Sequence, residues 1–523
     1  MVKYLDNANS GFSAWRASQN ATQKKSPLGG FLWWMIIFLA VWWVISAWFG
    51  GNNKTDAVAP AQIATVDVSN VPATEIKSDD VTMTVRGLRI SDVRLNKYAT
   101  SSDDPSPVVL LGGDNTWAEV GYIAATGRAP TATSVWKKSG DNTFTWHDAG
   151  VEYTRTINVD GYVISVADAI KNNSKSAIQI APYSRIVRGP SAQSSAAVDV
   201  GGVVYTGRGA DYTPWRRLDK KSFAFTANMG FVGFAEQYWE TIVAPTASDQ
   251  TMRMRSVSDG YDADVASAPI SIAPGANADI TTHIYAGPRA MRDLTAASAY
   301  IPGINRTMDY GWFWFLAQPM SWLLNTLDAV VHNYGIAIII MTILLRLILW
   351  PLTRKSFTSM LAMQRMQPEM ARIQKQFAND KMRLQMEMMK LYKTHKTSPM
   401  SGCLPLLIQI PIFFALYKAL LVSVQMRGSH FLWINDLAAM DPYFILPILM
   451  GATMWLQQYL QSSATRKNGA PKNDMAAATN RVMKWMPALF TIMFAWMPAG
   501  LVLYWTVSNL FGILQMYIIR KRG

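Results

Sequence analysis

The chain has 523 residues, of which 50% are hydrophobic and only 16% are charged, and its net charge is +14. A soluble domain usually carries about a quarter charged residues, so this composition indicates that much of the surface faces something other than water. The single cysteine, Cys403, excludes a disulfide framework and a cysteine-based metal site, and the hydrophobic content excludes a disordered chain.

The first apolar segment is residues 31–49, nineteen residues without a charge, and Lys24 and Lys25 precede it. At about 1.5 Å per residue it covers about 28 Å, enough for a hydrocarbon core of about 30 Å. A cleavable signal peptide is the alternative, but it requires a small-residue cleavage site, and this segment ends on two bulky aromatic residues. We expect an uncleaved anchor with a cytoplasmic N-terminus, residues 1–30.

Residues 50–80 form a predicted linker, and residues 81–305 form a predicted all-β domain. In the second segment, short runs alternate between apolar and polar residues, as in Val81–Val85 and Ile280–Ile284, and clusters of Gly, Pro, Asn and Asp separate the runs. This period of two is typical of strands with one buried face. The segment is long enough for one sizeable core, so we expect a β-sandwich.

Apolar segments and basic loops alternate from residue 310 onward. The apolar stretch 486–519 is too long for one span, and Met497–Gly500 predicts a turn inside it. Counting the first anchor, we expect an α-helical polytopic membrane protein with six spans. The predicted elements are an interfacial amphipathic helix (310–331), spans 2 to 6 (334–353, 404–425, 443–459, 486–497 and 500–519), a cytoplasmic helical hairpin (354–403), an outer loop (426–442), a cytoplasmic loop (460–485) and a cytoplasmic tail (520–523).

The distribution of charge predicts the orientation of these spans. Residues 354–400 hold ten basic and three acidic residues, residues 401–523 hold the same numbers, and residues 51–309 hold 24 basic and 27 acidic ones. Basic loops tend to stay in the cytoplasm, so both termini are expected there and the β-domain on the opposite side. If residues 310–331 also crossed the membrane, the basic loops after them would lie outside, which excludes a seventh span.

Arg346 is a charge inside a predicted span, about 12 Å from the cytoplasmic edge marked by Arg354. Such a charge costs about 2.5–3.5 kcal/mol on insertion scales. Arg346 either snorkels to the headgroups or faces a wet cavity, and we favour the cavity because the reach is long. No acidic residue in a span is available to neutralise it. The polar residues expected to line this cavity are Thr342 and Thr353 on the same helix face, Gln409, Ser508 and Asn509.

The hairpin 354–403 carries nine methionines interleaved with basic residues, and it is expected to break near Asn379-Asp380. Methionine surfaces adapt to varied apolar partners, which suits a site that receives an apolar segment. The alternative is that the methionines pack one helix on the other while the basic residues contact anionic lipid. The methionines singled out for this site are Met363, Met366, Met370, Met386 and Met389.

Motifs for enzymatic chemistry are missing from the sequence. The five histidines are scattered without metal-ligand spacing, and there is no phosphate-binding loop, dinucleotide fingerprint or nucleophile elbow. A secondary transporter or channel is one rival function, but it should show paired intramembrane charges and repeated halves. A membrane-anchored carbohydrate-active enzyme is another, with His147, Asp148 and His283 as acid/base groups, although scattered polar groups are more often structural. We expect no catalytic residue, cofactor, metal or nucleic-acid binding.

Several stretches carry a resemblance to a known family. They are Ile340–Arg346, Trp350–Thr353, Gly402–Phe413, Leu432–Leu437, Asp441–Gly451 and Gly500–Leu510, with weaker matches at Gln237-Tyr238 and Ala273–Gly275. In this order they resemble the YidC/Oxa/Alb family of bacterial membrane protein insertases over nearly all of residues 310–520. The resemblance implies a five-helix insertase core and, as in Gram-negative members, a periplasmic domain of β-supersandwich type.

The resemblance also implies a function and a set of partners. The chain would insert and help fold inner-membrane proteins, alone or with the SecYEG translocon and accessory Sec subunits. Arg346 and Thr342 match positions in a hydrophilic groove, and Phe413, Met450 and Trp505 match the path along which a substrate helix slides. Lys418 stands where an aromatic residue is more usual. Nascent membrane proteins and anionic lipids are expected partners, and ribosome binding stays open because the chain ends without a long basic tail.

Overall fold

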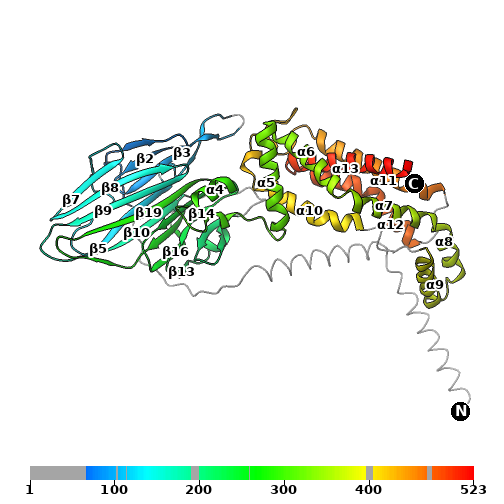
Figure 1. The fold of residues 1–523 in the computed structure, drawn as a ribbon, viewed down its shortest axis with the longest axis horizontal. Helices are drawn as coiled ribbons and strands as arrows, with labels where there is room; N and C mark the ends of the chain where they lie inside the picture. The colour runs from blue at the N-terminus through cyan, green and yellow to red at the C-terminus, as the bar shows by residue number, and fades with distance from the viewer. Residues whose placement is uncertain are drawn as a thin grey trace, which may run out of the picture.

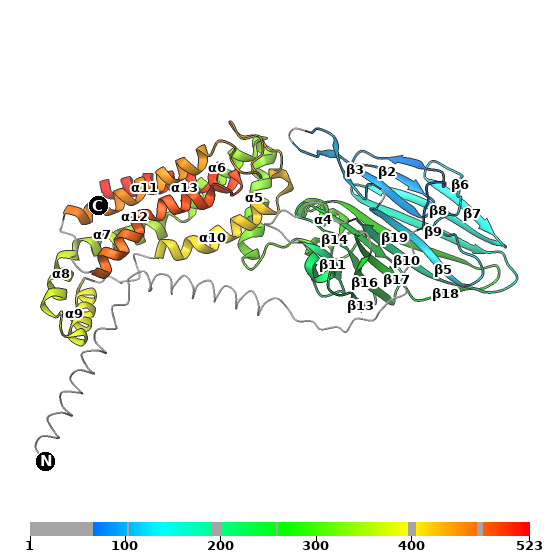
Figure 2. The ribbon, with the colours of Figure 1, turned by 180° about the vertical axis from the view of Figure 1, so that it is seen from behind.

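The computed structural model describes residues 66–101, 104–113, 115–189, 200–257, 260–395, 404–467 and 474–522. The anchor predicted at 31–49, the N-terminal segment 1–30 and Cys403 lie outside the described residues. A β-domain and a helical domain lie end to end along the long axis of the molecule (Figures 1 and 2).

The β-domain consists of two antiparallel sheets. The first has ten strands in the order β1-β2-β3-β5-β10-β17-β16-β13, with β4 paired to β3 and β18 to β10. Their bounds are β1 (Thr74–Lys77), β2 (Val81–Arg86), β3 (Arg89–Ala99), β4 (Pro107–Leu110), β5 (Trp117–Thr126), β10 (Ile178–Arg188), β13 (Phe223–Ala227), β16 (Gln250–Val257), β17 (Gly260–Ala266) and β18 (Ile270–Ile272).

The second sheet has nine strands in the order β12-β11-β14-β15-β19-β9-β8-β7-β6. Their bounds are β6 (Lys137–Lys138), β7 (Thr143–Asp148), β8 (Val151–Asp160), β9 (Val163–Asn172), β11 (Gly201–Tyr205), β12 (Ala210–Pro214), β14 (Phe231–Ala235), β15 (Trp239–Pro245) and β19 (Asn277–Pro288). The main hydrophobic core draws on both sheets, for example Ile90 and Val93 from the first and Ile164 and Ile284 from the second. The predicted two-sheet β-domain is therefore confirmed.

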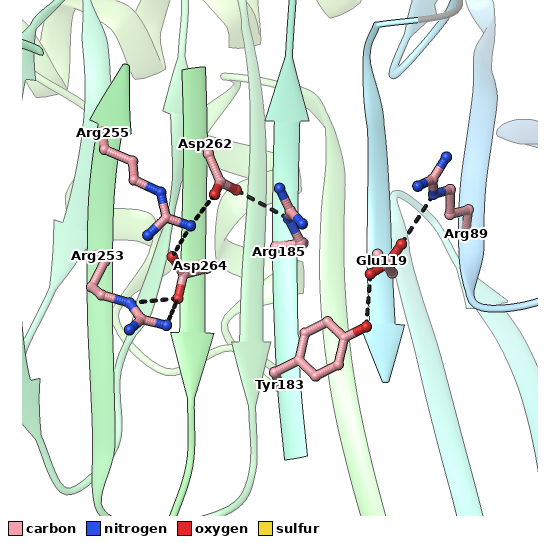
Figure 3. A network of polar contacts seen from close by, with 8 residues as sticks. All are labelled: Arg89, Glu119, Tyr183, Arg185, Arg253, Arg255, Asp262 and Asp264. Atoms are coloured by element: carbon pink, nitrogen blue, oxygen red, sulfur yellow. Dashed lines mark hydrogen bonds and ion pairs between the residues drawn. The ribbon is translucent and has the colours of Figure 1, made fainter. Parts of the chain in front are cut away.

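A row of buried ion pairs crosses the first sheet (Figure 3). Asp262 accepts from Arg185 at 3.2 Å and from Arg255 at 2.5 Å. Asp264 accepts from Arg253, and Glu119 accepts from Arg89 at 3.0 Å and from Tyr183 at 2.7 Å. Since each acid has a cation on a neighbouring strand, the charges are compensated inside the fold.

The helical domain contains all the longer helices. Its helices are α5 (Trp314–Val331), α6 (Tyr334–Ile348), α7 (Trp350–Arg365), α8 (Gln367–Gln376), α9 (Lys381–Thr394), α10 (Leu404–Leu421), α11 (Ile445–Lys467), α12 (Asp474–Phe494) and α13 (Ala499–Arg522), with the 3-10 turn η3 (Val424–Met426). The short helices α3 (Trp215–Leu218), α4 (Met291–Ala297) and η1 (Ile304–Thr307) belong to the β-domain and its exit. Helix α13 packs against α6 and α11, while α5 packs against α6 and α10.

The span predicted over 334–353 is not one straight helix. Helix α6 ends at Ile348, and the chain bends by 60° before α7 continues. Pro351 in the first turn of α7 has no N–H to donate to the preceding turn, which accounts for a break at this point. Thr353 therefore does not extend the helix face of Thr342 and Arg346, as a straight helix would require.

Helices α11 and α12 also extend into the predicted loop 460–485, since α11 ends at Lys467 and α12 begins at Asp474. The turn between α12 and α13 lies at residues 495–498, where the sequence placed one. By length and composition, Ala499–Lys521 is the one described helix able to cross a membrane, or one of two if the bent pair α6–α7 is a single span. The six spans therefore stay a prediction.

The C-terminal end of α10 is fixed to the β-domain. Arg427, in the loop after α10, donates to the backbone oxygens of Ala99, at 2.9 Å, and Thr100. Gln237, between β14 and β15, donates to the backbone oxygen of Leu421 at 3.0 Å. These contacts link segments far apart in the sequence, so they orient the helical domain relative to the sheets.

Candidate functional site

The site is built around Arg346, on the last turn of α6. Its Nε donates to Oγ of Ser508 on α13 at 2.9 Å, and its Nη2 contacts the same oxygen. Its backbone oxygen accepts from Nε2 of Gln515 at 3.3 Å. The side chain is half-buried, and no carboxylate among the described residues lies within 4.0 Å of it. The guanidinium is thus held by neutral groups and keeps its charge available for another partner.

The local sequence explains why Arg346 points toward α13. Asn333 caps α6 by accepting from the backbone N–H of Ile336 at 3.0 Å. Ala337, Ile338, Met341 and Thr342 are buried, and they define the face packed against the bundle. Residues four apart share a helix face, so Arg346 follows Thr342 on this buried side.

Thr342 itself is fully buried, and its hydroxyl donates to the backbone oxygen of Ile338 at 2.6 Å. This bond satisfies the hydroxyl within its own helix. Thr342 therefore lies one turn before Arg346 on α6, in a packed part of the bundle. Its hydroxyl hydrogen is used within the helix and is not available to a substrate.

Gln409 joins the site through a residue that the sequence reasoning missed. Its Nε2 donates to the hydroxyl of Tyr504 at 2.8 Å, and Tyr504 lies one turn before Ser508 on α13. Side chains from α6, α10 and α13 thus converge along one face of α13. The spacing of four between Tyr504 and Ser508 was the available signal, since it puts both hydroxyls on the same face.

Asn509 faces a different neighbour. Its Nδ2 donates to Oγ1 of Thr453 on α11 at 3.2 Å and lies 3.5 Å from the backbone oxygen of Met450. It is buried, so it holds α13 against α11. Of the five predicted polar residues, Ser508 and Gln409 gather with Arg346, Thr342 and Asn509 serve the packing around it, and Thr353 lies beyond the bend on α7.

The three predicted path residues belong to one apolar cluster. The rings of Phe413 and Trp505 meet edge to face with centroids 5.1 Å apart, and Phe494 lies 5.3 Å from Trp505. Phe413 and Trp505 are partly buried, while Met450 is fully buried in the same cluster. The aromatic pair therefore has accessible edges and Met450 lies beneath the surface.

The hairpin methionines divide into two groups. Met386 and Met389 on α9 are 59% and 56% exposed, whereas Met366 is buried and Met363 and Met370 are half-buried. The break between α8 and α9 lies at residues 377–380, and Asp380 caps α9 by accepting from the backbone N–H of Arg383 at 3.0 Å. The hairpin thus packs through some methionines and presents others to its surroundings.

Lys418 lies away from Arg346. It is nine residues beyond Gln409 on α10, or about 14 Å along the axis. Its Nζ is 2.9 Å from Oδ2 of Asp309, in the segment that leaves the β-domain. Burial alone raises the pKa of Asp309, but the Lys418 ammonium outweighs it and holds that pKa below its ordinary value. Lys418 therefore serves the junction between the domains.

The histidines of the β-domain do not form an acid/base pair. His147 is on β7 and His283 on β19, so three strand spacings, about 14 Å, separate them across the sheet, and the register shifts them by a further six residues, about 20 Å, along the strands. His283 shares a 2.9 Å hydrogen bond with Ser165, and burial lowers its pKa. In the described part of the chain, no cluster of three or more His, Cys, Asp or Glu is arranged to hold a metal ion.

Comparisons with known proteins agree along the whole described chain. A family described as "60Kd inner membrane protein" matches residues 326–523, and "YidC periplasmic domain" matches residues 73–323. The membrane protein insertase YidC of Sinorhizobium medicae is 36% identical over 484 residues, which cover 83% of this chain and 79% of that protein. YidC of Methylobacillus flagellatus is 36% identical over 462 residues, covering 82% and 80%. A crystal structure of an active YidC insertase matches with a TM-score of 0.36 and 17% identity, over 86% of this chain and 94% of that one.

Proposed function

The chain belongs to the YidC family of membrane protein insertases, and we propose that it inserts its substrates through a water-filled groove around Arg346 that opens to the cytoplasm. The family consists of insertases and not enzymes, so nascent membrane proteins are its substrates and the bacterial inner membrane is its expected location. The proposal concerns the route that a substrate takes and the residues it meets.

The arrangement of Arg346 and Ser508 is the observation that carries this proposal. A charge at this depth costs about 2.5–3.5 kcal/mol on insertion scales, and a neutral hydroxyl compensates only part of that cost. Water entering from the cytoplasm would supply the remaining solvation and would shorten the apolar barrier. The unneutralised guanidinium would then attract acidic residues in a short hydrophilic tail of the substrate.

The apolar part of the substrate leaves along the aromatic cluster. Phe413 and Trp505 are partly buried and Met450 is fully buried in the same cluster, so the two aromatic rings would contact the substrate and Met450 would lie beneath them. Transfer of apolar side chains into lipid is favourable by about 25 cal/mol per Å² of buried surface, so no nucleotide is needed to drive release.

The position of the domains supports the predicted topology. Helix α5 lies beside the β-domain and across the ends of the other helices, with Trp312, Trp314 and Trp322 exposed, as suits an interfacial helix (Figure 1). Helices α8 and α9 lie at the opposite end. We propose six spans with cytoplasmic termini, a periplasmic β-domain of supersandwich type and a cytoplasmic hairpin.

The hairpin is the proposed receiving site. Met386 and Met389 offer an exposed, adaptable apolar surface, and the exposed Lys390 and Lys393 beside them suit anionic headgroups. Met363, Met366 and Met370 are less exposed, and we include them in the same proposed site. We also propose that the chain works alone or beside the SecYEG translocon and its accessory Sec subunits.

Insertion into reconstituted vesicles tests the electrostatic step. Two substrates would differ only in whether the translocated tail is acidic or neutral. We expect Arg346→Ala to slow the acidic substrate about tenfold and the neutral one much less. Arg354→Ala is the matched control, because it removes an exposed charge one element away. Equal slowing of both substrates by Arg346→Ala would remove the electrostatic step, and photo-crosslinking from positions 413 and 505 to a stalled nascent chain would test the path independently.

A further inference from the structure

A second concave surface lies between α11 and α12. It has a volume of about 640 Å³ and is lined by Ile448, Gly451, Ala452, Trp455, Lys484, Trp485, Pro487, Ala488, Thr491 and Ile492. None of these residues belongs to α6, α10 or α13, so this groove is separate from the site around Arg346.

The two helices that line the groove approach each other closely at Gly451 on α11 and Thr491 on α12. A Cβ atom added to Gly451 would lie 1.9 Å from Oγ1 of Thr491, so only glycine permits this approach. Thr491 satisfies its hydroxyl on the backbone oxygen of Pro487 at 2.8 Å. The groove floor is thus a tight crossing without a free hydroxyl, and its walls are apolar.

The walls carry large exposed side chains. Trp485 is 67% exposed, Ile492 61% and Trp455 53%. Apolar patches of this kind mark contact with lipid or with another protein. Lipid would cover any apolar face of a membrane helix, so the concave shape and the charge at its rim are what set this face apart.

The charge at the rim is Lys484, which is exposed and has no carboxylate within 4.0 Å among the described residues. The apolar part of α12 begins at the next residue, Trp485. In the proposed topology this places the ammonium at the cytoplasmic end of the groove, within reach of the headgroups. A cation above an apolar groove is complementary to an anionic headgroup above an acyl chain.

The volume decides which occupant fits. An α-helix with side chains is about 10 Å wide, so one turn occupies roughly 400 Å³. A groove of about 640 Å³ therefore does not enclose a helix, which would contact it with one face only. An acyl chain is narrow enough to lie in it along its length.

We propose that the groove between α11 and α12 binds one anionic phospholipid, with an acyl chain between Trp455 and Trp485 and the phosphate on Lys484. This inference uses the orientation of α12 given under the proposed function, but it does not depend on how Arg346 acts. A lipid held there would fill the space beside the Gly451–Thr491 crossing and support the contact between the two helices.

Native mass spectrometry of the full chain, titrated with phosphatidylglycerol or phosphatidylcholine, tests the site. We expect Lys484→Gln to weaken phosphatidylglycerol binding about fivefold, which corresponds to about 1 kcal/mol, and to leave phosphatidylcholine unaffected. Ala452→Phe, which fills the groove, should weaken both lipids. Lys521→Gln is the matched control, since Lys521 is also exposed but lies on α13.

Equal effects of Lys484→Gln and Lys521→Gln would overturn the proposal, as would equal affinity of the unmodified chain for the two lipids. A photo-crosslinker at position 452 distinguishes the occupants in cells: a lipid adduct supports the proposal, and a nascent-chain adduct contradicts it. The insertion assay of Arg346→Ala in reconstituted vesicles tests the proposed function separately. The lipid site and the electrostatic step of insertion can therefore each be disproved without the other.

Discussion

Lys418 and Asp309 are 109 residues apart in the sequence, and their side chains meet at 2.9 Å between Nζ and Oδ2. Asp309 lies just after the β-domain and Lys418 near the C-terminal end of α10. Together with the bonds from Arg427 and Gln237, this pair connects the two domains through three separate segments. The β-domain is therefore attached to the bundle by side-chain contacts as well as by the chain itself.

A double-mutant cycle with Lys418→Met and Asp309→Asn should give a modest coupling. Their side chains are 33% and 55% exposed, so we expect about 0.2–1 kcal/mol. The folded pKa of Asp309 lies below its ordinary value of 3.8, so the coupling is present above that value and is lost as the pH falls through the folded pKa. Unfolding in mixed micelles at pH 7 and at a series of pH values below 3.8 would check both points. A coupling that does not decrease anywhere in that series, down to the pH at which Asp309 is protonated in the folded chain, would contradict this account.

Ser508 offers a direct test of why Arg346 lacks an acidic partner. Ser508→Asp would place a carboxylate beside the guanidinium and neutralise it permanently. We expect this variant to lose its preference for acidic tails, as Arg346→Ala does, while neutral-tailed substrates are inserted at a similar rate. Ser508→Asn is the control, because it keeps a hydrogen-bond acceptor without adding charge. The ratio of the two insertion rates in vesicles is the measurement, and a preserved ratio in Ser508→Asp would exclude a role for the free charge.

Local patterns in the sequence were sufficient for the β-domain. Strand β2, for example, alternates buried and half-buried residues along Val81–Arg86, which is the period that predicted it. Arg346 was also identified from the sequence, because a charge in an apolar segment is conspicuous. These features depend on neighbouring residues only.

Features that depend on tertiary contacts were missed. Pro351 was a local signal for the bend between α6 and α7. It was not used, because the length and apolar composition of 334–353 are those of one full span. The partner of Lys418 and the separation of Asn509 from Arg346 follow from helix packing, which no local pattern encodes. Tyr504 was overlooked because a tyrosine in an apolar helix is usually a core residue. Only its hydrogen bond from Gln409 shows that it belongs to the site.

The ion pairs of the first sheet lead to a stability prediction. Asp262 accepts from both Arg185 and Arg255, and all three side chains are nearly inaccessible. Asp262→Ala would leave two buried cations with an incomplete partner, so we expect a loss of about 3–5 kcal/mol in the free energy of unfolding of the β-domain. Glu75→Ala, which breaks an exposed pair with Lys77, should cost less than about 1 kcal/mol. Hydrogen exchange of the first-sheet strands in the full chain would measure both, and similar values for the two variants would contradict the role of burial.

Glu240 predicts a pH dependence where the β-domain meets its exit segment. It is fully buried, and burial raises its pKa to about 7, more than Arg289 and Thr307 lower it. Its Oε1 accepts from Thr307 at 3.0 Å, and its Oε2 lies 3.5 Å from Nε of Arg289. Because Thr307 belongs to η1, ionisation of Glu240 acts on the segment that leads to α5.

The sign of this effect follows from the proton balance. Between pH 4.5, the ordinary pKa, and pH 7, the folded carboxyl binds more protons than the unfolded one, so stability falls as the pH rises and levels off above about 7. The total loss in the free energy of unfolding across this pH window is about 3 kcal/mol. Glu240→Gln keeps the shape but cannot ionise, so its stability should stay flat across this window. Hydrogen exchange of β15 and residues 304–307 in the full chain, at pH 5 and pH 8, is the measurement. The same pH dependence in both proteins would assign it to another group.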